Sequence, residues 1–385
     1  MGGNSFDFAS AVTVDRQSTV YVTGRTVSQN LPQNVGFAGT SLFGPSGGVD
    51  AFVIAMTMPA SPPSLTVIWA TYYGSPSWTT QANAIATSGA NDVVIVGQAL
   101  PIGTNPPLLP ATTAATPLIN NVPFGLLTFP SPSSPGQMAF AAHFSYAPVP
   151  GTVVLDYATQ LIGTAFVNGF SRSDAANGVV VDAAGDVIVA GNTTDTDFVG
   201  GATAGAFQAV RAAAGLPAGA RVGIALALRL TGRTLTAPWV TFLGGPGADT
   251  CSCIALDAEG DLGIAGTTSA AAFPTTSGTP ANAYLGGASD GFVCEMDPVG
   301  SGLYWSSFFG GTGADTINSL AVSSNTDEFV VVGSSNTSPT WGVGGVSSEI
   351  PVFQGGTIDG FLATFRLPDV SVVHSSLKFK AAVGG

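Results

Sequence analysis

The sequence predicts an all-β fold, a five-bladed β-propeller of four-stranded antiparallel blades with long inserts between the second and third strands. Three observations lead to this prediction. Strand-like patterns recur in groups of four, a glycine ends the second strand of each group, and turn residues separate the strands. Four antiparallel strands repeated at a regular period are typical of a propeller blade.

The clearest group of strands occupies residues 249–311. Its strands are expected at 251–256, 262–266, 290–296 and 303–309. The first alternates small or polar residues with aliphatic ones, and the turn that follows has Gly260 near the position that needs a positive φ. In the third, Phe292, Cys294 and Met296 share one face because side chains alternate along a strand.

The first strands of the other blades are placed by their match to Ser252, Ile254 and Leu256. The matching residues are Ser10, Val12 and Val14; Asn83, Ile85 and Thr87; Asn177, Val179 and Val181; and Asn318, Leu320 and Val322. One face of each strand is expected to be bulky and the other small, as at Cys251 and Cys253, so that neighbouring sheets interlock. The second strands end at Gly24, Gly97, Gly191, Gly266 and Gly333, which gives five blades.

The third and fourth strands also share marker residues. The third strands are expected to begin at Phe52, Phe140, Ile224, Phe292 and Phe361. The fourth strands carry an aromatic residue at a common position, which is Trp69, Tyr157 (after a one-residue bulge), Trp239, Trp305 or Phe379. Such an aromatic can stack on a sugar, as in lectins, or pack between blades. Packing is favoured, because a core position must recur in every blade and a binding site need not.

The blades are expected at residues 1–75, 76–163, 164–245, 246–311 and 312–385 of a single domain. Residues 379–385 align with the fourth strand at 305–311, so the chain is expected to begin at a first strand and to stop at a fourth. The ring is then expected to close by side-chain packing.

Several short motifs of the clearest group resemble a known family. They are Ile254-Ala-Leu-Asp257, Gly260-Asp261, Ala265-Gly-Thr-Thr268, Phe273-Pro-Thr-Thr276, Gly286-Gly-Ala-Ser-Asp-Gly-Phe-Val293 and the segment 305–311. Together they resemble the bacterial SBBP-type β-propeller repeat, and the first two strands are similar to NHL-type units. The resemblance implies a secreted or surface protein. That family usually suggests seven blades, whereas this sequence contains five groups.

The composition restricts the partners. Only 9% of the residues are charged, where about 25% is usual, and the net charge is −13. This charge repels nucleic acid and acidic membranes, and no apolar run approaches the roughly 18 residues of a membrane span. The N-terminus lacks the basic start and apolar core of a signal peptide. We expect an extracellular or cell-surface location, with a virion component as the alternative.

Residues that could carry chemistry are few. Cys251, Cys253 and Cys294 are expected to be small buried core residues rather than ligands. His143 and His374 lie in no recognisable nucleophile or metal motif, and His143 is expected on the outer face of a blade. No residue pattern predicts a catalytic site, so no enzyme is expected, and a glycoside-acting enzyme is the third-ranked alternative.

No cofactor is expected, with one alternative. Asp7, Asp174, Asp249 and Asp315 occupy one equivalent position before the first strands, and Thr80 occupies the fifth. Capping of the Gly-Gly turns by these carboxylates is the favoured interpretation, and a Ca²⁺ site is the alternative.

The expected function rests on the inserts. The longest, at 98–138, is rich in proline yet contains many large apolar residues: Leu108, Leu109, Leu118, Ile119, Val122, Phe124, Leu126, Leu127 and Phe129. Exposed apolar patches usually mark contact surfaces. The sequence therefore favours a non-catalytic structural or docking module that binds other subunits or copies of itself. A carbohydrate-binding propeller is the alternative, and folding of the inserts back over their own blades is the competing interpretation.

Overall fold

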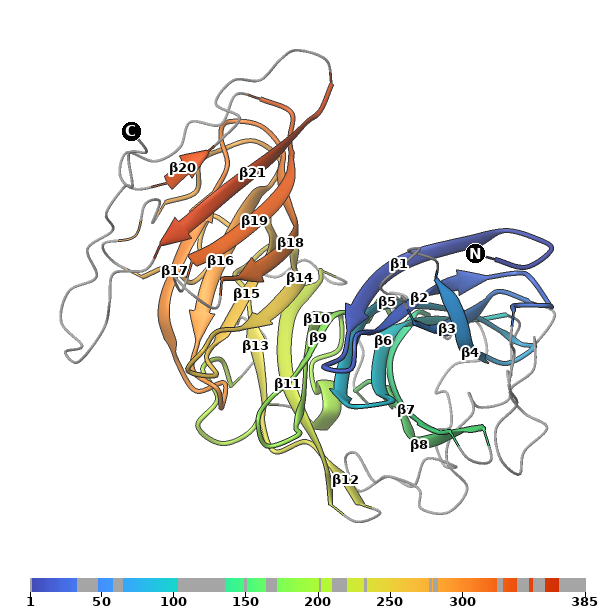
Figure 1. Ribbon diagram of the computed structural model, residues 1–385. Coiled ribbons are helices and arrows are strands. Elements are labelled where there is room, and N and C mark those ends of the chain that lie inside the picture. The colour runs from blue at the N-terminus through green and yellow to red at the C-terminus, as the bar shows by residue number, and fades with distance from the viewer. Residues whose placement is uncertain are drawn as a thin grey trace. The chain divides into compact units, whose positions relative to one another are not determined.

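The computed structural model describes residues 2–32, 48–57, 65–102, 136–148, 151–163, 172–200, 202–209, 220–231, 234–276, 279, 283–323, 328–337, 346–348 and 357–366. These residues form five β-sheets, one for each blade (Figure 1). The helical structure among them is a single short 3-10 turn, η2 (Phe198–Gly200). The predicted all-β, five-bladed propeller is confirmed.

The strands follow one another in the expected order. The first blade contains β1 (Asp7–Val14), β2 (Thr19–Thr26), β3 (Asp50–Thr57) and β4 (Thr66–Tyr73), and the second contains β5 (Trp78–Gly89), β6 (Asp92–Pro101), β7 (Met138–Ala147) and β8 (Thr152–Leu161). In the third blade, β9 (Ala175–Val181), β10 (Val187–Thr193) and β11 (Val222–Thr231) are followed by β12 (Thr234–Thr236) and β13 (Val240–Leu243), which both pair with β11.

The last two blades differ at their outer edge. The fourth contains β14 (Asp249–Leu256), β15 (Leu262–Thr268), β16 (Asp290–Met296) and β17 (Leu303–Phe309) in sequential order. The fifth contains β18 (Asp315–Val322), β19 (Glu328–Ser335), β20 (Val346–Ser348) and β21 (Asp359–Arg366), and β20 lies outside β21 in the sheet. The fourth strand that the sequence predicts at 379–385, with Phe379, lies outside the described residues.

A β-bulge explains the recurring glycines. The pairing of the first and second strands shifts by one residue between Ala9 and Ala11, Ala82 and Ala84, Cys251 and Cys253, and Ile317 and Ser319. A Cβ atom on Gly266 would lie 1.9 Å from the Thr250 carbonyl oxygen, and Gly24, Gly97 and Gly333 face first-strand carbonyl oxygens in the same way. Only glycine lets the second strand approach the bulged backbone this closely.

The bulge also corrects the predicted alternation of side chains. Cys251 and Cys253 were expected on one face, but the extra residue turns them to different neighbours. Cys251 Sγ lies close to Gly223 of the third blade, whereas Cys253 belongs to the core cluster of Leu320 and Phe329 in the fifth. All three cysteines are buried thiols outside any disulfide, and their burial is what the sequence predicts.

The aromatic residues of the fourth strands are core residues. Trp69, Tyr157, Trp239 and Trp305 are all buried, and Trp305 packs edge to face against Phe329 of the next blade. The bulge predicted near Tyr157 is present, between His143 and Phe144 of the neighbouring strand. A ring buried in this way has no free face for a sugar, so the packing interpretation is confirmed for these four positions.

The described ends of the inserts fold back over their own blades. Leu31 is buried against Phe52, Ile54 and Tyr72 of the first blade, and its N–H donates to the Tyr72 hydroxyl at 2.9 Å. In the fourth blade, Phe273 packs on Phe292 at 4.3 Å between ring centroids. The predicted interaction residues between Leu108 and Phe129 lie outside the described residues.

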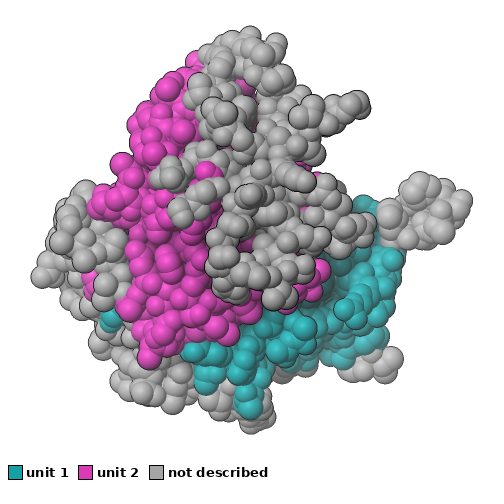
Figure 2. All heavy atoms as spheres, turned by 90° about the vertical axis from the view of Figure 1, so that its left-hand side faces the viewer, with its two compact units in different colours: residues 1–189, 197–200, 228–238 teal, residues 190–196, 201–227, 239–385 magenta. Residues whose placement is uncertain are grey.

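The chain divides into two compact units (Figure 2). The first comprises residues 1–189, 197–200 and 228–238, and the second comprises 190–196, 201–227 and 239–385. The third blade therefore supplies residues to both units. In the described part of the chain, no helix has the length and apolar character that crossing a membrane requires.

Candidate functional site

In four blades, polar residues recur at the corner where the first strand turns into the second. Asp15, Asp182 and Asp257 begin the turn in three blades, and each accepts the N–H of the residue four positions later at 2.7–2.8 Å. A residue at the end of the turn has a positive φ, at Ser18 (63°), Asn91 (59°), Gly185 (85°) and Gly260 (92°). The aspartate therefore caps a tight turn that contains a left-handed residue.

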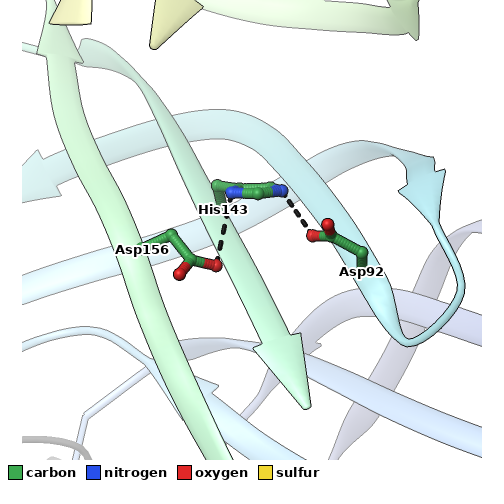
Figure 3. Close-up of side chains that lie close together, drawn as sticks. All are labelled: Asp92, His143 and Asp156. Carbon is green, nitrogen blue, oxygen red and sulfur yellow. Dashed lines mark ion pairs between the residues drawn. The ribbon is translucent and has the colours of Figure 1, made fainter. Parts of the chain in front are cut away.

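The second blade adds a histidine to this corner. His143 of β7 lies opposite Val94 of β6 and Tyr157 of β8, with Asp92 at the start of β6 and Asp156 in the bulge of β8. Figure 3 shows the imidazole between the two carboxylates. Nε2 is 2.5 Å from Asp92 Oδ1, and Nδ1 is 3.4 Å from Asp156 Oδ2. The Ser88 hydroxyl is 2.9 Å from Nε2.

This His143 cluster, defined as Asp92, His143 and Asp156, is largely buried yet open on one side. The side chain of His143 is 14% exposed and those of the two aspartates are 31% and 29% exposed. Burial raises the pKa of Asp156 and nearby Asp92 adds to the rise, while the Ser145 hydrogen bond and His143 oppose it. Tyr157 stacks on the imidazole with ring centroids 5.2 Å apart, and burial raises the pKa of its hydroxyl.

Four polar atoms of this region have no hydrogen-bond partner among the described residues. They are Asp92 Oδ1, His143 Nδ1, Asp156 Oδ2 and the Tyr157 hydroxyl oxygen. Asp92 Oδ1 lies within ion-pair distance of His143 Nε2, and Asp156 Oδ2 lies within that distance of Nδ1, but neither contact follows the directions in which hydrogen bonds form. The side chains of the cluster therefore pack closely, but these donor and acceptor atoms form no hydrogen bonds with one another.

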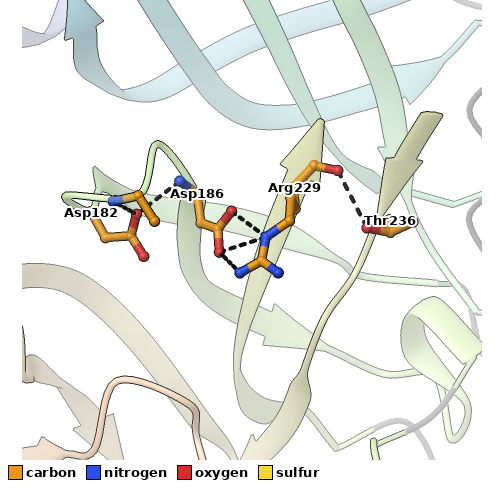
Figure 4. A network of polar contacts seen from close by, with 5 residues as sticks. Asp182, Asp186, Arg229 and Thr236 are labelled. Atoms are coloured by element: carbon orange, nitrogen blue, oxygen red, sulfur yellow. Dashed lines mark hydrogen bonds and ion pairs between the residues drawn. The ribbon is translucent and has the colours of Figure 1, made fainter. Parts of the chain in front are cut away.

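The third blade shows how the same corner looks when its carboxylate is fully paired. Asp186, at the position equivalent to Asp92, accepts hydrogen bonds from Arg229 Nε at 2.8 Å and Nη2 at 2.5 Å (Figure 4). Asp182 caps the turn behind it through the Asp186 N–H. This bidentate pair joins two strands of one sheet and leaves no ligand atom free, so we interpret it as structural.

The fourth blade gathers three carboxyl groups at the same corner. Glu295 of β16 occupies the position of His143, and Asp257 and Asp261 occupy those of Ser88 and Asp92. Burial, together with Asp257 and Asp261, raises the pKa of Glu295 to about 8. Burial, together with Asp257, Glu259 and Asp297, raises that of Asp261 to about 6. Within the described residues no ion pair to these three groups is formed, so Glu295 is protonated at neutral pH.

The acids that the sequence predicts as turn caps lie at the opposite ends of the strands. Asp7, Asp249 and Asp315 accept the N–H groups of Gly3, Gly245 and Gly311 at 2.8–2.9 Å. Asp7 and Asp249 also accept hydroxyl hydrogen bonds from Thr26 and Thr268. Asp174 instead lies 3.4 Å from Arg172 Nε. These contacts fit the favoured capping interpretation, and the Ca²⁺ alternative remains a prediction.

We expect replacement of Asp249 by asparagine to lower the free energy of unfolding by about 2 kcal/mol. Its two oxygens accept from Gly245 N–H and Thr268 Oγ1, and an amide nitrogen in place of one oxygen would face a donor in a buried site. The control is Asp297→Asn, because Oδ1 accepts both backbone N–H groups there and the Ser301 hydroxyl that donates to Oδ2 is exposed and can rotate to accept from an amide. Urea unfolding should show a change below about 0.5 kcal/mol for the control; equal losses would contradict the argument.

The sequence interpretation missed both polar clusters. His143 was expected on an outer face with no role, but it lies between two carboxylates, and Glu295 was not paired with any residue. Aligning the strands of the blades by their marker residues would have shown that these polar residues occupy equivalent positions. His143 and Glu295 both stand three residues after the phenylalanine of the third strand, and Asp92 and Asp261 both stand five residues before the second-strand glycine. The recurrence of acidic residues in the blades favours a structural role, so this interpretation assigns no role to the residues of the two polar clusters.

Comparison with known proteins gives no family. No family model and no curated protein matches the sequence. Among solved structures, the chain is similar to a Bacteroides uniformis protein provisionally named a 6-phosphogluconolactonase, with 12% identity over 91% of this chain and 88% of that one and a TM-score of 0.37.

Two other solved structures are similar at the same level. For a Pseudomonas aeruginosa periplasmic gluconolactonase the identity is 10% over 94% of this chain and 84% of that one, with a TM-score of 0.34. For a Lactobacillus plantarum protein the identity is 9% over 79% and 84%, with a TM-score of 0.25. At these values the likeness extends no further than the class of fold.

These findings correct the expected function. The sequence favoured a non-catalytic structural module and expected no enzyme, with a glycoside-acting enzyme as the third-ranked alternative, yet two of the similar structures are named as lactonases. The sequence interpretation also grouped His143 with no other polar residue, whereas the strands bring His143, Asp92 and Asp156 together. The structural-module interpretation is therefore not retained.

Proposed function

We propose that the protein is a hydrolase whose reaction centre is the His143 cluster, and that it opens an ester bond, with lactones as the first substrates to test. The observation that carries this proposal is the imidazole of His143, held between two carboxylates with the Ser88 hydroxyl 2.9 Å from Nε2. Imidazole is the side chain that exchanges protons near neutral pH. A carboxylate beside one ring nitrogen orients the ring so that the other can exchange a proton.

The arrangement suits general acid–base hydrolysis. Water attacks the carbonyl carbon and forms the new C–O bond, while the imidazole accepts the proton that the water loses. The ester C–O bond then breaks, and the same proton passes to the departing oxygen. Asp156 and Asp92 lie close enough to stabilise the positive ring during this step. Both are about 30% exposed, so water reaches the cluster.

The test is hydrolysis of a panel of substrates, in which a pH-stat measures the acid that is released. The panel contains gluconolactone, simple five- and six-membered lactones and an aryl ester. We expect His143→Gln to lower kcat by about 10²- to 10⁴-fold, the usual contribution of a general acid–base group. The matched control is Asp186→Asn, which removes a carboxylate at the equivalent corner of the third blade. Unchanged kcat in the His143 variant, or no turnover of any panel member by the native protein, would overturn the proposal.

Two further expectations belong to this proposal. The first is that the repeats are of the SBBP type, which the motifs between residues 254 and 311 support. The second is a location outside the cytoplasm, which the low charge content and that resemblance support. Fractionation of the native host with an antibody to the chain tests the location, and recovery in the cytosol alone would contradict it.

A further inference from the structure

We propose that Asp92, His143 and Asp156 bind one divalent transition-metal ion of the zinc or manganese class. The inference goes beyond the proposed function, since hydrolysis by a free imidazole needs no ion and an ion can bind whether or not the protein is a hydrolase. Its basis is the set of donor atoms that the second blade places at one corner.

The first argument concerns the unpaired atoms. Asp92 Oδ1, His143 Nδ1 and Asp156 Oδ2 are buried and have no hydrogen-bond partner within the described part of the chain. Leaving one such atom buried and unpaired costs about 1–3 kcal/mol, and more for a charged group. Three of them on neighbouring side chains are therefore expected to share a partner that hydrogen bonding within the chain does not provide. A cation is the partner that suits two carboxylates.

The second argument is the contrast with the third blade. At the equivalent corner, Arg229 meets Asp186 with two aligned hydrogen bonds, so the carboxylate is satisfied within the protein. If the His143 cluster were a structural ion pair of the same kind, an aligned hydrogen bond from a ring nitrogen to a carboxylate would be expected. The nitrogen and oxygen atoms instead approach to 2.5 Å and 3.4 Å without that alignment. The charge also does not balance, because one imidazole faces two carboxylates.

The third argument is the donor set itself. One atom from each residue lies within 4.8 Å of the other two. Donors on opposite sides of an ion with bonds of about 2.1 Å are about 4.2 Å apart, so small side-chain rotations bring all three to one ion. Imidazole nitrogen with carboxylate oxygen suits zinc and manganese, whereas Ca²⁺ and Mg²⁺ prefer all-oxygen sites. The three residues come from β6, β7 and β8, so adjacent strands of one sheet hold them.

The test is calorimetric titration of the chelator-stripped full chain with ZnCl₂ and with MnCl₂, with CaCl₂ and MgCl₂ as reference ions. We expect one site for zinc or manganese and at least about 10-fold weaker binding of the reference ions. Co²⁺ provides an optical readout, since a nitrogen ligand changes its visible absorption. Binding in this test is measured without any substrate.

The variants assign the site. We expect His143→Gln and Asp156→Asn each to weaken binding by at least about 100-fold, because changes to residues that only hydrogen-bond to a metal ligand already weaken binding by about 10- to 100-fold. Asp186→Asn, at the equivalent corner of the third blade, and His374→Gln, at the other histidine of the sequence, should leave binding unchanged. A melting temperature close to that of the native chain confirms that a variant is folded.

The outcomes separate this inference from the proposed function. Absence of zinc and manganese binding, or binding that survives both His143→Gln and Asp156→Asn, overturns the metal site. In that case hydrolysis that depends on His143 would still support the hydrolase. Tight binding lost in both variants, with no turnover of any lactone or ester, would keep the metal site and remove the proposed reaction.

Discussion

Replacement of Gly266 by alanine is expected to lower the free energy of unfolding by about 3 kcal/mol or more. The added Cβ would lie 1.9 Å from the Thr250 carbonyl oxygen and 3.0 Å from the Ser252 nitrogen. Both atoms belong to backbone that the bulge holds in place, so no side-chain rotation relieves the clash. Overpacking of a fixed core typically costs about 1–3 kcal/mol, and a clash with backbone lies at or above the top of that range.

Gly89→Ala is the matched control for this experiment. Gly89 lies in β5, and the nearest atom to an added Cβ there is 3.8 Å away, which is ordinary van der Waals contact. We expect a change within about 0.5 kcal/mol in urea unfolding. If the two variants unfolded at similar denaturant concentrations, the recurring glycines would not be explained by the bulge.

The second large effect is a loss of stability with rising pH that depends on Glu295. Its pKa in the folded chain is about 8, against 4.5 for an ordinary glutamate, and burial is the main cause. Between these two values the folded chain holds a proton that the unfolded chain has released. Folding is therefore most favoured by this group below about pH 4.5, and that contribution is lost as the pH rises to about 8. A difference of about 3.5 pKa units corresponds to a loss on the order of 5 kcal/mol.

Glu295→Gln should flatten this part of the stability curve. The amide keeps the shape of the neutral carboxyl and can still donate to Asp257, which is hydrogen-bonded to Glu295. We expect the variant and the native chain to be similar near pH 5 and the variant to be the more stable near pH 9. Glu328→Gln, a glutamate of β19 that lies outside this corner, is the control and should leave the curve unchanged. Parallel curves for native chain and Glu295 variant, measured by urea unfolding from pH 4 to pH 9, would contradict the assignment.

The fold could be predicted because its markers are local. The glycine of each second strand and the aromatic of the fourth strands recur at fixed places in the repeat. Gly266 faces the bulge of the adjacent strand, and Trp305 lies in a core cluster with Phe329 of the next blade. A pattern that depends on period and on nearest-neighbour strands can be recognised in the sequence without coordinates.

The candidate site could not be predicted in the same way. Asp92, His143 and Asp156 lie on three strands, and 36 residues of insert, at 102–137, separate the first of these strands from the second. Their proximity depends on the register between strands and on the bulge that brings Asp156 to the His143 side. A shift of one residue in a strand moves every side chain to the other face. The repeat identifies the residues that the blades share. The candidate chemistry depends instead on His143 in the second blade and Glu295 in the fourth, which differ from the residues of the other blades.

By itself, the sequence therefore determined the class of fold, the number of blades, the core aromatics and the burial of the cysteines. These follow from hydrophobic alternation and from glycine positions, which act over a few residues or one strand pair. Tertiary structure alone decided that Glu295 is a protonated acid beside two aspartates and that His143 lies between two carboxylates. The charge state of a side chain depends on its burial, and proximity depends on the distance between strands. Neither quantity can be obtained from the sequence alone.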